Sequence, residues 1–202
     1  MGRATMRGSA MIRGLYDWTI SLAESRYALW ALAVVSFVES SVFPIPPDVL
    51  MIPMIIAQPR RAWVIASVAL VASVLGGLLG YYIGWGLFES VGRPVLEFYG
   101  KDAYFEDFRA RYNEWGAWAV LIAGMTPFPY KVITILSGTT GLNLGVFMIA
   151  SVVARGARFF VLAGLLWKFG APIRDFIEKW LNLIFVIFVI GLIGGFYLVK
   201  YL

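Results

Sequence analysis

Five ionisable side chains stand inside long apolar stretches of the sequence, and their types suggest the chemistry they could perform. They are Glu39, Asp48, Lys131, Arg155 and Arg158. On insertion scales each costs roughly 2.5–3.5 kcal/mol at the centre of a membrane-spanning helix, so five unpaired residues would cost on the order of 15 kcal/mol. We therefore expect these five residues to share a polar cavity at bilayer depth, where they pair with one another or with water.

The balance of these charges favours an anionic ligand. Two acids and three bases leave a net positive charge, and helix N-termini in the same region add partial positive charge. A phosphate is the natural complement, because guanidinium groups such as those of Arg155 and Arg158 bind phosphate in a bidentate way. Glu39 and Asp48 are then candidate proton carriers.

Each of these residues also has a purely structural interpretation. Glu39 could form a structural bridge with Arg155 or Arg158, and Asp48 could cap the helix that follows it. Lys131 could extend its amine to the membrane surface. The two arginines, three residues apart on one helical face, could clamp together the two helical hairpins that are predicted below. The residues alone leave both interpretations open.

The composition indicates a membrane protein. Of 202 residues, 60% are hydrophobic and 14% are charged, against roughly 45–50% and 25% in soluble domains. The net charge of +5 is explained by anionic lipid headgroups, so we expect no nucleic-acid partner. The chain has no Cys and no His, which argues against metal sites, cofactors and His-dependent enzymes; intramembrane aspartyl proteases need two buried aspartates, and only Asp48 qualifies. We expect no enzyme activity.

Prolines interrupt two apolar segments that would otherwise span a membrane. Segment 27–57 breaks at 43–48, and segment 116–142 breaks at 126–131. The prolines in or near these breaks are Pro44, Pro46, Pro47, Pro53, Pro127 and Pro129. A proline within a helix costs about 3 kcal/mol, and the arms beside each break are shorter than the roughly 20 residues needed to cross. The sequence predicts two re-entrant helical hairpins.

The remaining segments predict three spanning helices, at 62–88, 145–168 and 180–199. Segments 10–25, 89–115 and 171–179 are amphipathic or rich in charge and aromatics, and we expect them at the membrane interface. Within the first spanning helix, Gly76, Gly80 and Gly84 recur every four residues. Small residues at this spacing allow another helix to approach closely, either within the chain or in a homo-oligomer.

The two broken segments form a weak internal repeat, about 27–97 and 116–179. Each repeat holds one hairpin that returns and one helix that crosses, so successive repeats must point in opposite directions. We therefore predict an all-α, polytopic membrane protein with two opposed re-entrant hairpins that meet near the midplane, where many transporters place their site. Lys and Arg are more frequent in the segments that this topology places with the N-terminus, which favours a cytoplasmic N-terminus.

Four motifs, in order, closely resemble the DedA membrane proteins, and among them the YqaA-type branch that carries the VTT (SNARE-associated) domain. The motifs are Glu39-Ser40-Ser41-x-Phe43-Pro44-x-Pro46-Pro47-Asp48, Gly76-Gly77-x-x-Gly80-Tyr81, Thr126-Pro127-x-Pro129-Tyr130-Lys131 and Arg155-Gly156-x-Arg158-Phe159. The resemblance covers roughly residues 25–175. It divides the chain into a basic interfacial segment (1–25), a DedA/VTT-like domain (26–179) and a C-terminal helix (180–202).

The resemblance implies movement of lipids between leaflets of the bacterial inner membrane. The implied substrates are undecaprenyl phosphate and phospholipids such as phosphatidylethanolamine, with proton coupling. The family's acidic pair falls on Glu39 and Asp48. Its second hairpin usually carries two arginines around a proline, and here the corresponding residues are Thr126 and Lys131. We hypothesise that Arg155 and Arg158 take over phosphate binding beside them.

The leading functional hypothesis is therefore a lipid translocase for a phosphate-bearing lipid, with protons as the coupling ion. A proton-coupled transporter of a small solute or ion, using the same cavity, is the first alternative. A membrane scaffold that transports nothing is the second.

Overall fold

A computed structural model describes residues 27–42, 46–126 and 128–170, and within these ranges every regular element is a helix. The all-α prediction is confirmed for them. The predicted interfacial segments 10–25 and 171–179 and the predicted helix 180–199 lie outside the described residues, as do Pro44 and Pro127.

The helices follow one another with short connections. In chain order they are α2 (Ala28–Ser41), α3 (Asp48–Ala57), the 3-10 turn η1 (Pro59–Arg61), α4 (Ala62–Leu87), the π-helical turn η2 (Phe88–Gly92), α5 (Arg93–Tyr99), α6 (Asp102–Met125), α7 (Tyr130–Thr139) and α8 (Leu144–Phe169).

Among the described residues, two stretches are long and apolar enough to cross a membrane, by length and composition. One is Leu144–Phe169, which matches the predicted span 145–168. The other is Pro59–Tyr99, which contains the predicted span 62–88 but continues through η2 and α5. It ends where Gly100 takes a left-handed conformation (φ +60°) that favours glycine.

The segment predicted at 89–115 does not end at Trp115 as a separate helical unit. α6 begins at Asp102 and continues without interruption through Trp115 to Met125. Its first half is charged and its second half is apolar, but residues 102–125 contain no proline. A change of polarity alone leaves the backbone hydrogen bonds of a helix intact, so the boundary predicted from composition was wrong.

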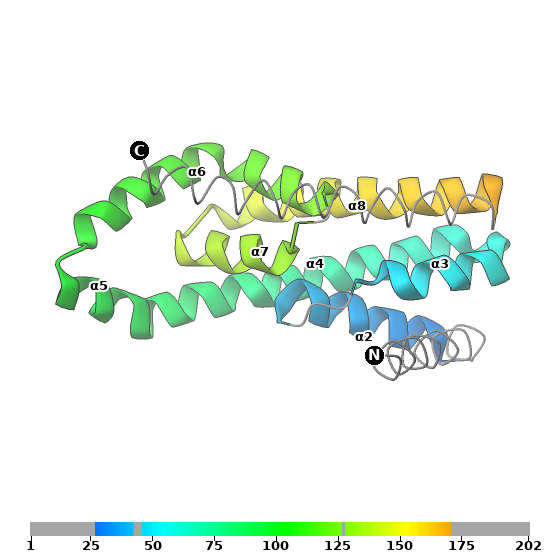
Figure 1. Ribbon diagram of the computed structural model, residues 1–202, viewed down its shortest axis with the longest axis horizontal. Coiled ribbons are helices and arrows are strands. Elements are labelled where there is room, and N and C mark those ends of the chain that lie inside the picture. The colour runs from blue at the N-terminus through cyan, green and yellow to red at the C-terminus, as the bar shows by residue number, and fades with distance from the viewer. Residues whose placement is uncertain (1–26, 43–45, 127, 171–202) are drawn as a thin grey trace, which may run out of the picture.

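The two predicted breaks are present. α2 ends at Ser41 and α3 begins at Asp48, while α6 ends at Met125 and α7 begins at Tyr130. In Figure 1, α3 returns toward the right-hand end from which α2 comes, and α7 returns toward the left-hand end from which α6 comes. Pro53, by contrast, lies inside α3 without ending it. We refer to α2–α3 as the first hairpin and to α6–α7 as the second.

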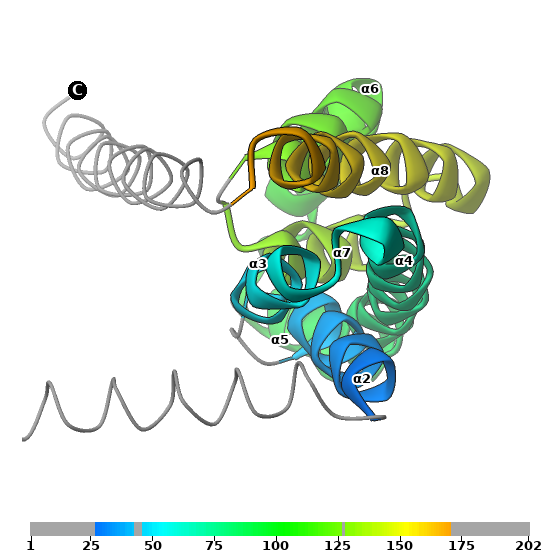
Figure 2. The same cartoon turned by 90° about the vertical axis from the view of Figure 1, so that its right-hand side faces the viewer.

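Helix α4 is the central support of both hairpins, because α2, α7 and α8 all pack along it. Figure 2 shows α8 above α3 and α7, α2 below them and α4 beside them. The glycines of α4 permit this packing. A Cβ atom at Gly76 would overlap the backbone of Phe37 in α2, and one at Gly84 would overlap the backbone of Ile135 in α7. The predicted close approach is confirmed, and the partners are helices of the same chain.

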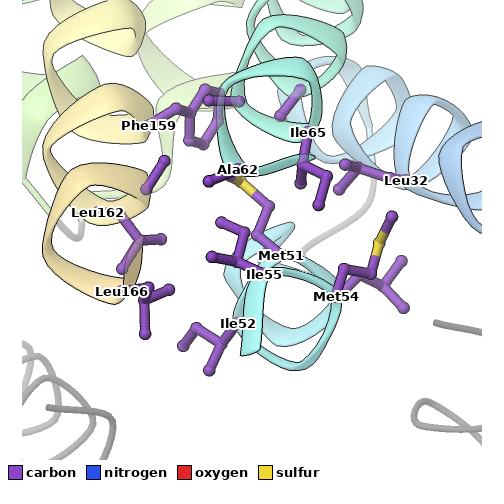
Figure 3. Packing of buried hydrophobic residues seen from close by; sticks show 14 of the residues in the cluster. Leu32, Met51, Ile52, Met54, Ile55, Ala62, Ile65, Phe159, Leu162 and Leu166 are labelled. Atoms are coloured by element: carbon purple, nitrogen blue, oxygen red, sulfur yellow. The ribbon is translucent and has the colours of Figure 1, made fainter. Parts of the chain in front are cut away.

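Two apolar clusters fix the helices around the centre of the molecule. The first joins α2, α3, α4 and α8, and in Figure 3 Met51 and Ile55 of α3 lie between Leu32 of α2 and the α8 side chains Phe159 and Leu162. The second joins α4, α6, α7 and α8 through Tyr81, Val120, Tyr130, Phe147 and their neighbours. Phe159 of the first cluster and Tyr130 of the second both contact Arg155, so this arginine lies where the two clusters meet.

Candidate functional site

Arg155 forms a buried ion pair with the first hairpin. Its Nη2 donates to Oε2 of Glu39 over 2.7 Å, and its Nε donates to Oγ of Ser73 over 2.6 Å. Only 3% of the Arg155 side chain and 14% of the Glu39 side chain are exposed. The pair joins α8 to the last turn of α2, so the structural bridge proposed for Glu39 from the sequence is present.

Two aromatic rings flank the Arg155 guanidinium. Its central carbon lies 4.8 Å from the ring centroid of Tyr130 and 4.6 Å from that of Phe159. Cation–π contacts of this kind gain strength when they are desolvated. The ring of Tyr130 is itself held in place, because its hydroxyl donates to Oγ of Ser151. Arg155 is therefore fixed by its charge, its hydrogen bonds and both of its faces.

Two serine hydroxyls complete the surroundings of this pair. Oγ of Ser40 lies 2.7 Å from Oγ of Ser73 and donates to Oε2 of Glu39 over 3.1 Å. The hydroxyl of Thr134, in α7, donates to the Ser40 carbonyl over 3.1 Å. Hydrogen bonds thus connect α2, α4, α7 and α8 around the Glu39 carboxylate, whose side chain is 14% exposed.

Arg158 forms the second ion pair, and it links both hairpins. Its Nη2 pairs with Oδ2 of Asp48, at the start of α3, and its Nη1 donates to the carbonyl of Thr126 over 2.8 Å, directly after α6. The Arg158 side chain is 16% exposed and that of Asp48 is 9% exposed. The clamp between the hairpins, which the sequence left open as a structural role for the two arginines, is therefore present at Arg158.

The capping role considered for Asp48 is not observed. Asp48 is the first residue of α3, Pro47 occupies the N-cap position, and no side chain caps this end of the helix in the described structure. The carboxylate turns to Arg158 instead, since a charge-assisted hydrogen bond is stronger than one to a backbone amide. Its other oxygen, Oδ1, is buried and finds no hydrogen-bond partner among the described residues.

Lys131 lies apart from both ion pairs. Its Nζ donates to the carbonyl of Val42, at the C-terminal end of α2, over 3.3 Å. A cation at this position interacts favourably with the helix dipole. Lys131 is partly exposed, and it forms a further link between the two hairpins.

The structure thus brings four of the five predicted charges together as two ion pairs, whereas Lys131 binds the end of α2 apart from them. Of the turn prolines, Pro46 and Pro47 precede α3 and Pro129 precedes α7. The sequence did not predict that Ser73 would be a hydrogen-bond partner of Arg155. Its place beside the glycines of α4 indicated only close packing, and nothing in the spacing showed that Ser40 would face it.

Comparison with known proteins identifies the family. The model of the VTT domain matches residues 45–168. The chain belongs to the VTT-domain (DedA) family. The match includes Asp48, Lys131, Arg155 and Arg158, whereas Glu39 precedes it.

Relatives in the VTT-domain family agree with this assignment. Proteins from Haemophilus influenzae and Histophilus somni, both named only as uncharacterized, are each 38% identical over 168 residues, which is 81% of this chain and 87% of theirs. An uncharacterized membrane protein of Mycobacterium leprae is 23% identical over 114 residues, 56% of this chain and 47% of that one. No solved structure matches the chain. With its apolar helices, this VTT-domain protein is a membrane protein.

Proposed function

We propose that this protein moves a phosphate-bearing lipid between the two leaflets of the bacterial inner membrane, with protons as the coupling ion. The observation that carries the proposal is the position of Arg158. This arginine pairs with Asp48 of the first hairpin and with the Thr126 carbonyl of the second. A group that replaces Asp48 at Arg158 would act on both hairpins at once.

In this proposal both hairpins re-enter the membrane from opposite faces, as an inverted repeat. α3 and α7 have 10 residues each, and at 1.5 Å per residue each measures about 15 Å, half of a typical bilayer core. The opposite directions in which the hairpins open in Figure 1 support this arrangement. We place the N-terminus in the cytoplasm.

Phosphate binding follows from the chemistry of Arg158. A phosphate offers the same pair of oxygens as a carboxylate, so it can replace Asp48 on the guanidinium. The Lys131 amine and the Thr126 hydroxyl would bind further phosphate oxygens, and the N-termini of α3 and α7 add partial positive charge. Displaced Asp48 takes up a proton, because a buried carboxylate without a counter-charge is strongly disfavoured.

Glu39 and Arg155 have a different part in the proposal. Glu39 is the second proton carrier, and its ion pair joins α2 to α8. Protonation of Glu39 weakens this ion pair and lets α2 move relative to α8. Arg155 then has a free guanidinium that assists the phosphate during its passage. Two proton-carrying carboxylates on one hairpin thus control the two arginines of one helix.

One observation favours a second candidate, the membrane scaffold. Both arginines are already paired with carboxylates of the same chain, which is what a purely structural clamp requires. A scaffold needs the pairs only for stability. A translocase needs at least one pair to open and close during each cycle.

The test is leaflet exchange in proteoliposomes, with fluorescent phospholipid and polyprenyl phosphate as separate probes, with and without a pH gradient. Glu39→Gln and Asp48→Asn are compared with wild type. Glu89→Gln is the matched control, because Glu89 forms an ion pair of 2.8 Å with Arg93 in which both side chains are 47% exposed.

The proposal predicts gradient-sensitive exchange of one lipid by wild type and Glu89→Gln, and its loss in the two buried variants. Absence of exchange of any lipid by folded wild-type protein would contradict it. In that case, uptake of inorganic phosphate or another ion by the same vesicles would indicate a solute transporter, and absence of uptake would leave the scaffold.

A further inference from the structure

Four buried or nearly buried polar side chains form a closed ring around the first ion pair. Glu39 and Ser40 come from α2, Ser73 from α4 and Arg155 from α8. The ring runs from Arg155 Nε to Ser73 Oγ (2.6 Å), on to Ser40 Oγ (2.7 Å), to Glu39 Oε2 (3.1 Å) and back to Arg155 Nη2 (2.7 Å). Ser40 and Ser73 are completely buried, so water does not compete for these hydroxyls.

The direction of every hydrogen bond in the ring is fixed. Arginine nitrogens only donate, so the Ser73 oxygen accepts from Arg155. An ionised carboxylate only accepts, so Ser40 must donate to Glu39. Each serine has a single hydroxyl hydrogen, and Ser40 has used its own. The hydrogen between the two serines therefore belongs to Ser73, which donates to Ser40.

Protonation of Glu39 at either carboxylate oxygen disturbs the ring or its charge balance. A proton on Oε2 would have to be donated to Ser40, and Ser40 would then donate to Ser73. Ser73 would accept from both sides, and its own hydrogen would have no acceptor within the ring. A proton on Oε1 leaves the ring unchanged but removes the negative charge that balances Arg155. Either way, protonation of Glu39 costs the ring a favourable interaction.

We propose that Ser73 is a positioning residue that, through Ser40, makes the ring selective for ionised Glu39 and so keeps α2, α4 and α8 joined until that carboxylate takes a proton. The proposal rests on the proposed proton-coupled function for its role in transport. It goes beyond that function because it assigns the control of the Glu39–Arg155 pair to two neutral hydroxyls.

Other charged and titratable groups also face this site. Arg155 and Arg158 of α8 and Tyr130 of α7 interact electrostatically with Glu39, and Asp48 of α3 interacts with both arginines. Lys131 of α7 contacts the end of α2. All of these groups are the same in wild type and in a Ser73→Ala variant, so a difference between the two proteins reports the ring itself.

The experiment measures leaflet exchange per folded protein as a function of pH, with fluorescent polyprenyl phosphate in proteoliposomes. Ser73→Ala is expected to move the midpoint of the profile upward by about one pH unit, which corresponds to about 1.4 kcal/mol, because Ser40 loses the hydrogen bond that orients its own bond to Glu39. Ser40→Ala breaks the same ring and should move the midpoint in the same direction. It also serves in place of Ser73→Ala if that variant does not fold.

Ser67→Ala is the matched control. Ser67 lies in the same helix, but its hydroxyl is exposed and donates to the Trp63 carbonyl over 2.9 Å. The pH profile of Ser67→Ala should therefore have the same midpoint as that of wild type. The proposal is overturned if the profile of Ser73→Ala keeps the wild-type midpoint and changes only in rate, or if Ser67→Ala shifts it as much.

A second measurement separates this proposal from the proposed function. If wild type exchanges no lipid, the proposed function fails, and the ring is then tested by thermal unfolding in detergent. The Arg155→Lys variant retains the charge but lacks the Nε–H that reaches Ser73. Ser73→Ala should therefore lower the unfolding temperature much less in an Arg155→Lys background than in wild type. Equal losses in the two backgrounds would overturn the proposal.

Discussion

Arg155 and Arg158 lie less than one turn apart on α8, and each pairs with a carboxylate of the first hairpin, yet their surroundings differ. Arg155 is 3% exposed, donates to Glu39 and Ser73, and lies between two aromatic rings. Arg158 is 16% exposed, and its partner Asp48 leaves one oxygen without a hydrogen bond among the described residues. These surroundings make the Arg155–Glu39 pair a structural ion pair. In the Arg158–Asp48 pair, by contrast, a ligand can displace Asp48.

This difference predicts that substitution of one arginine mainly lowers stability, whereas substitution of the other mainly lowers transport. A buried pair is costly to break from one side, because the remaining charge has no partner. The charge left by loss of Arg158 is that of Asp48, which is only 9% exposed, but removal of the 16% exposed Arg158 side chain opens a path for water to it. Loss of Arg155 should therefore destabilise the protein most, and loss of Arg158 should mainly remove ligand binding.

The largest effect is expected for Arg155→Ala. This change leaves the Glu39 carboxylate buried without its counter-charge and opens a space between the rings of Tyr130 and Phe159. We expect a loss of about 3–5 kcal/mol in the free energy of unfolding. Denaturant unfolding in detergent, followed by tryptophan fluorescence, measures it. A smaller loss of unfolding free energy than that of Arg158→Ala would contradict the structural role assigned to Arg155.

Arg158→Ala should cost less, about 1–3 kcal/mol, since Asp48 gains access to water once the side chain is removed. Lipid exchange should nevertheless fall to the background of empty vesicles. Unfolding and exchange are measured on the same preparation. Normal exchange by a folded Arg158→Ala protein would remove Arg158 from the proposed phosphate site.

Tyr130→Phe tests how neighbouring side chains hold Arg155 in its ion pair with Glu39. The variant keeps the aromatic ring beside Arg155 but removes the hydroxyl that donates to Ser151. A loss of about 1 kcal/mol is expected, as for a typical hydrogen bond. Tyr130→Ala, which also removes the ring, should cost clearly more. Equal losses would mean that the ring contributes nothing to holding Arg155.

Lys131→Met should have the smallest effect on stability, below about 0.5 kcal/mol, since the side chain is partly exposed and makes one hydrogen bond of 3.3 Å. Exchange of a phosphate-bearing lipid should fall by a larger factor than exchange of a lipid without phosphate. A similar reduction for both lipids would show that Lys131 does not contact the phosphate.

The sequence was sufficient for the features that depend on local chemistry. Clustered prolines predicted both helix breaks, and the glycine spacing in α4 predicted the close approach of other helices, because backbone geometry decides both. The pairing of charges needed the tertiary structure. The choice of Arg155 by Glu39 and of Arg158 by Asp48 depends on how α2, α3 and α8 lie relative to one another.

Other features gave no usable signal in the sequence. Ser73 is one of several small residues in an apolar helix, and its contact with Arg155 depends on residues 82 positions apart. The continuity of α6 through Trp115 was hidden by a change in polarity that does not affect helix geometry. Pro53 lies within α3 because its neighbours are held by the apolar cluster, an effect of packing that a rule about single residues does not contain.

The central claim is that a phosphate replaces Asp48 on Arg158 while Asp48 takes up a proton. The most direct measurement is proton uptake from weakly buffered solution when short-chain polyprenyl phosphate is added to the detergent-solubilised protein, with empty micelles as the blank. We predict uptake of about one proton for each lipid bound by wild type, and binding without uptake by Asp48→Asn. Equal uptake by the two proteins, or binding to wild type without uptake, would contradict the account.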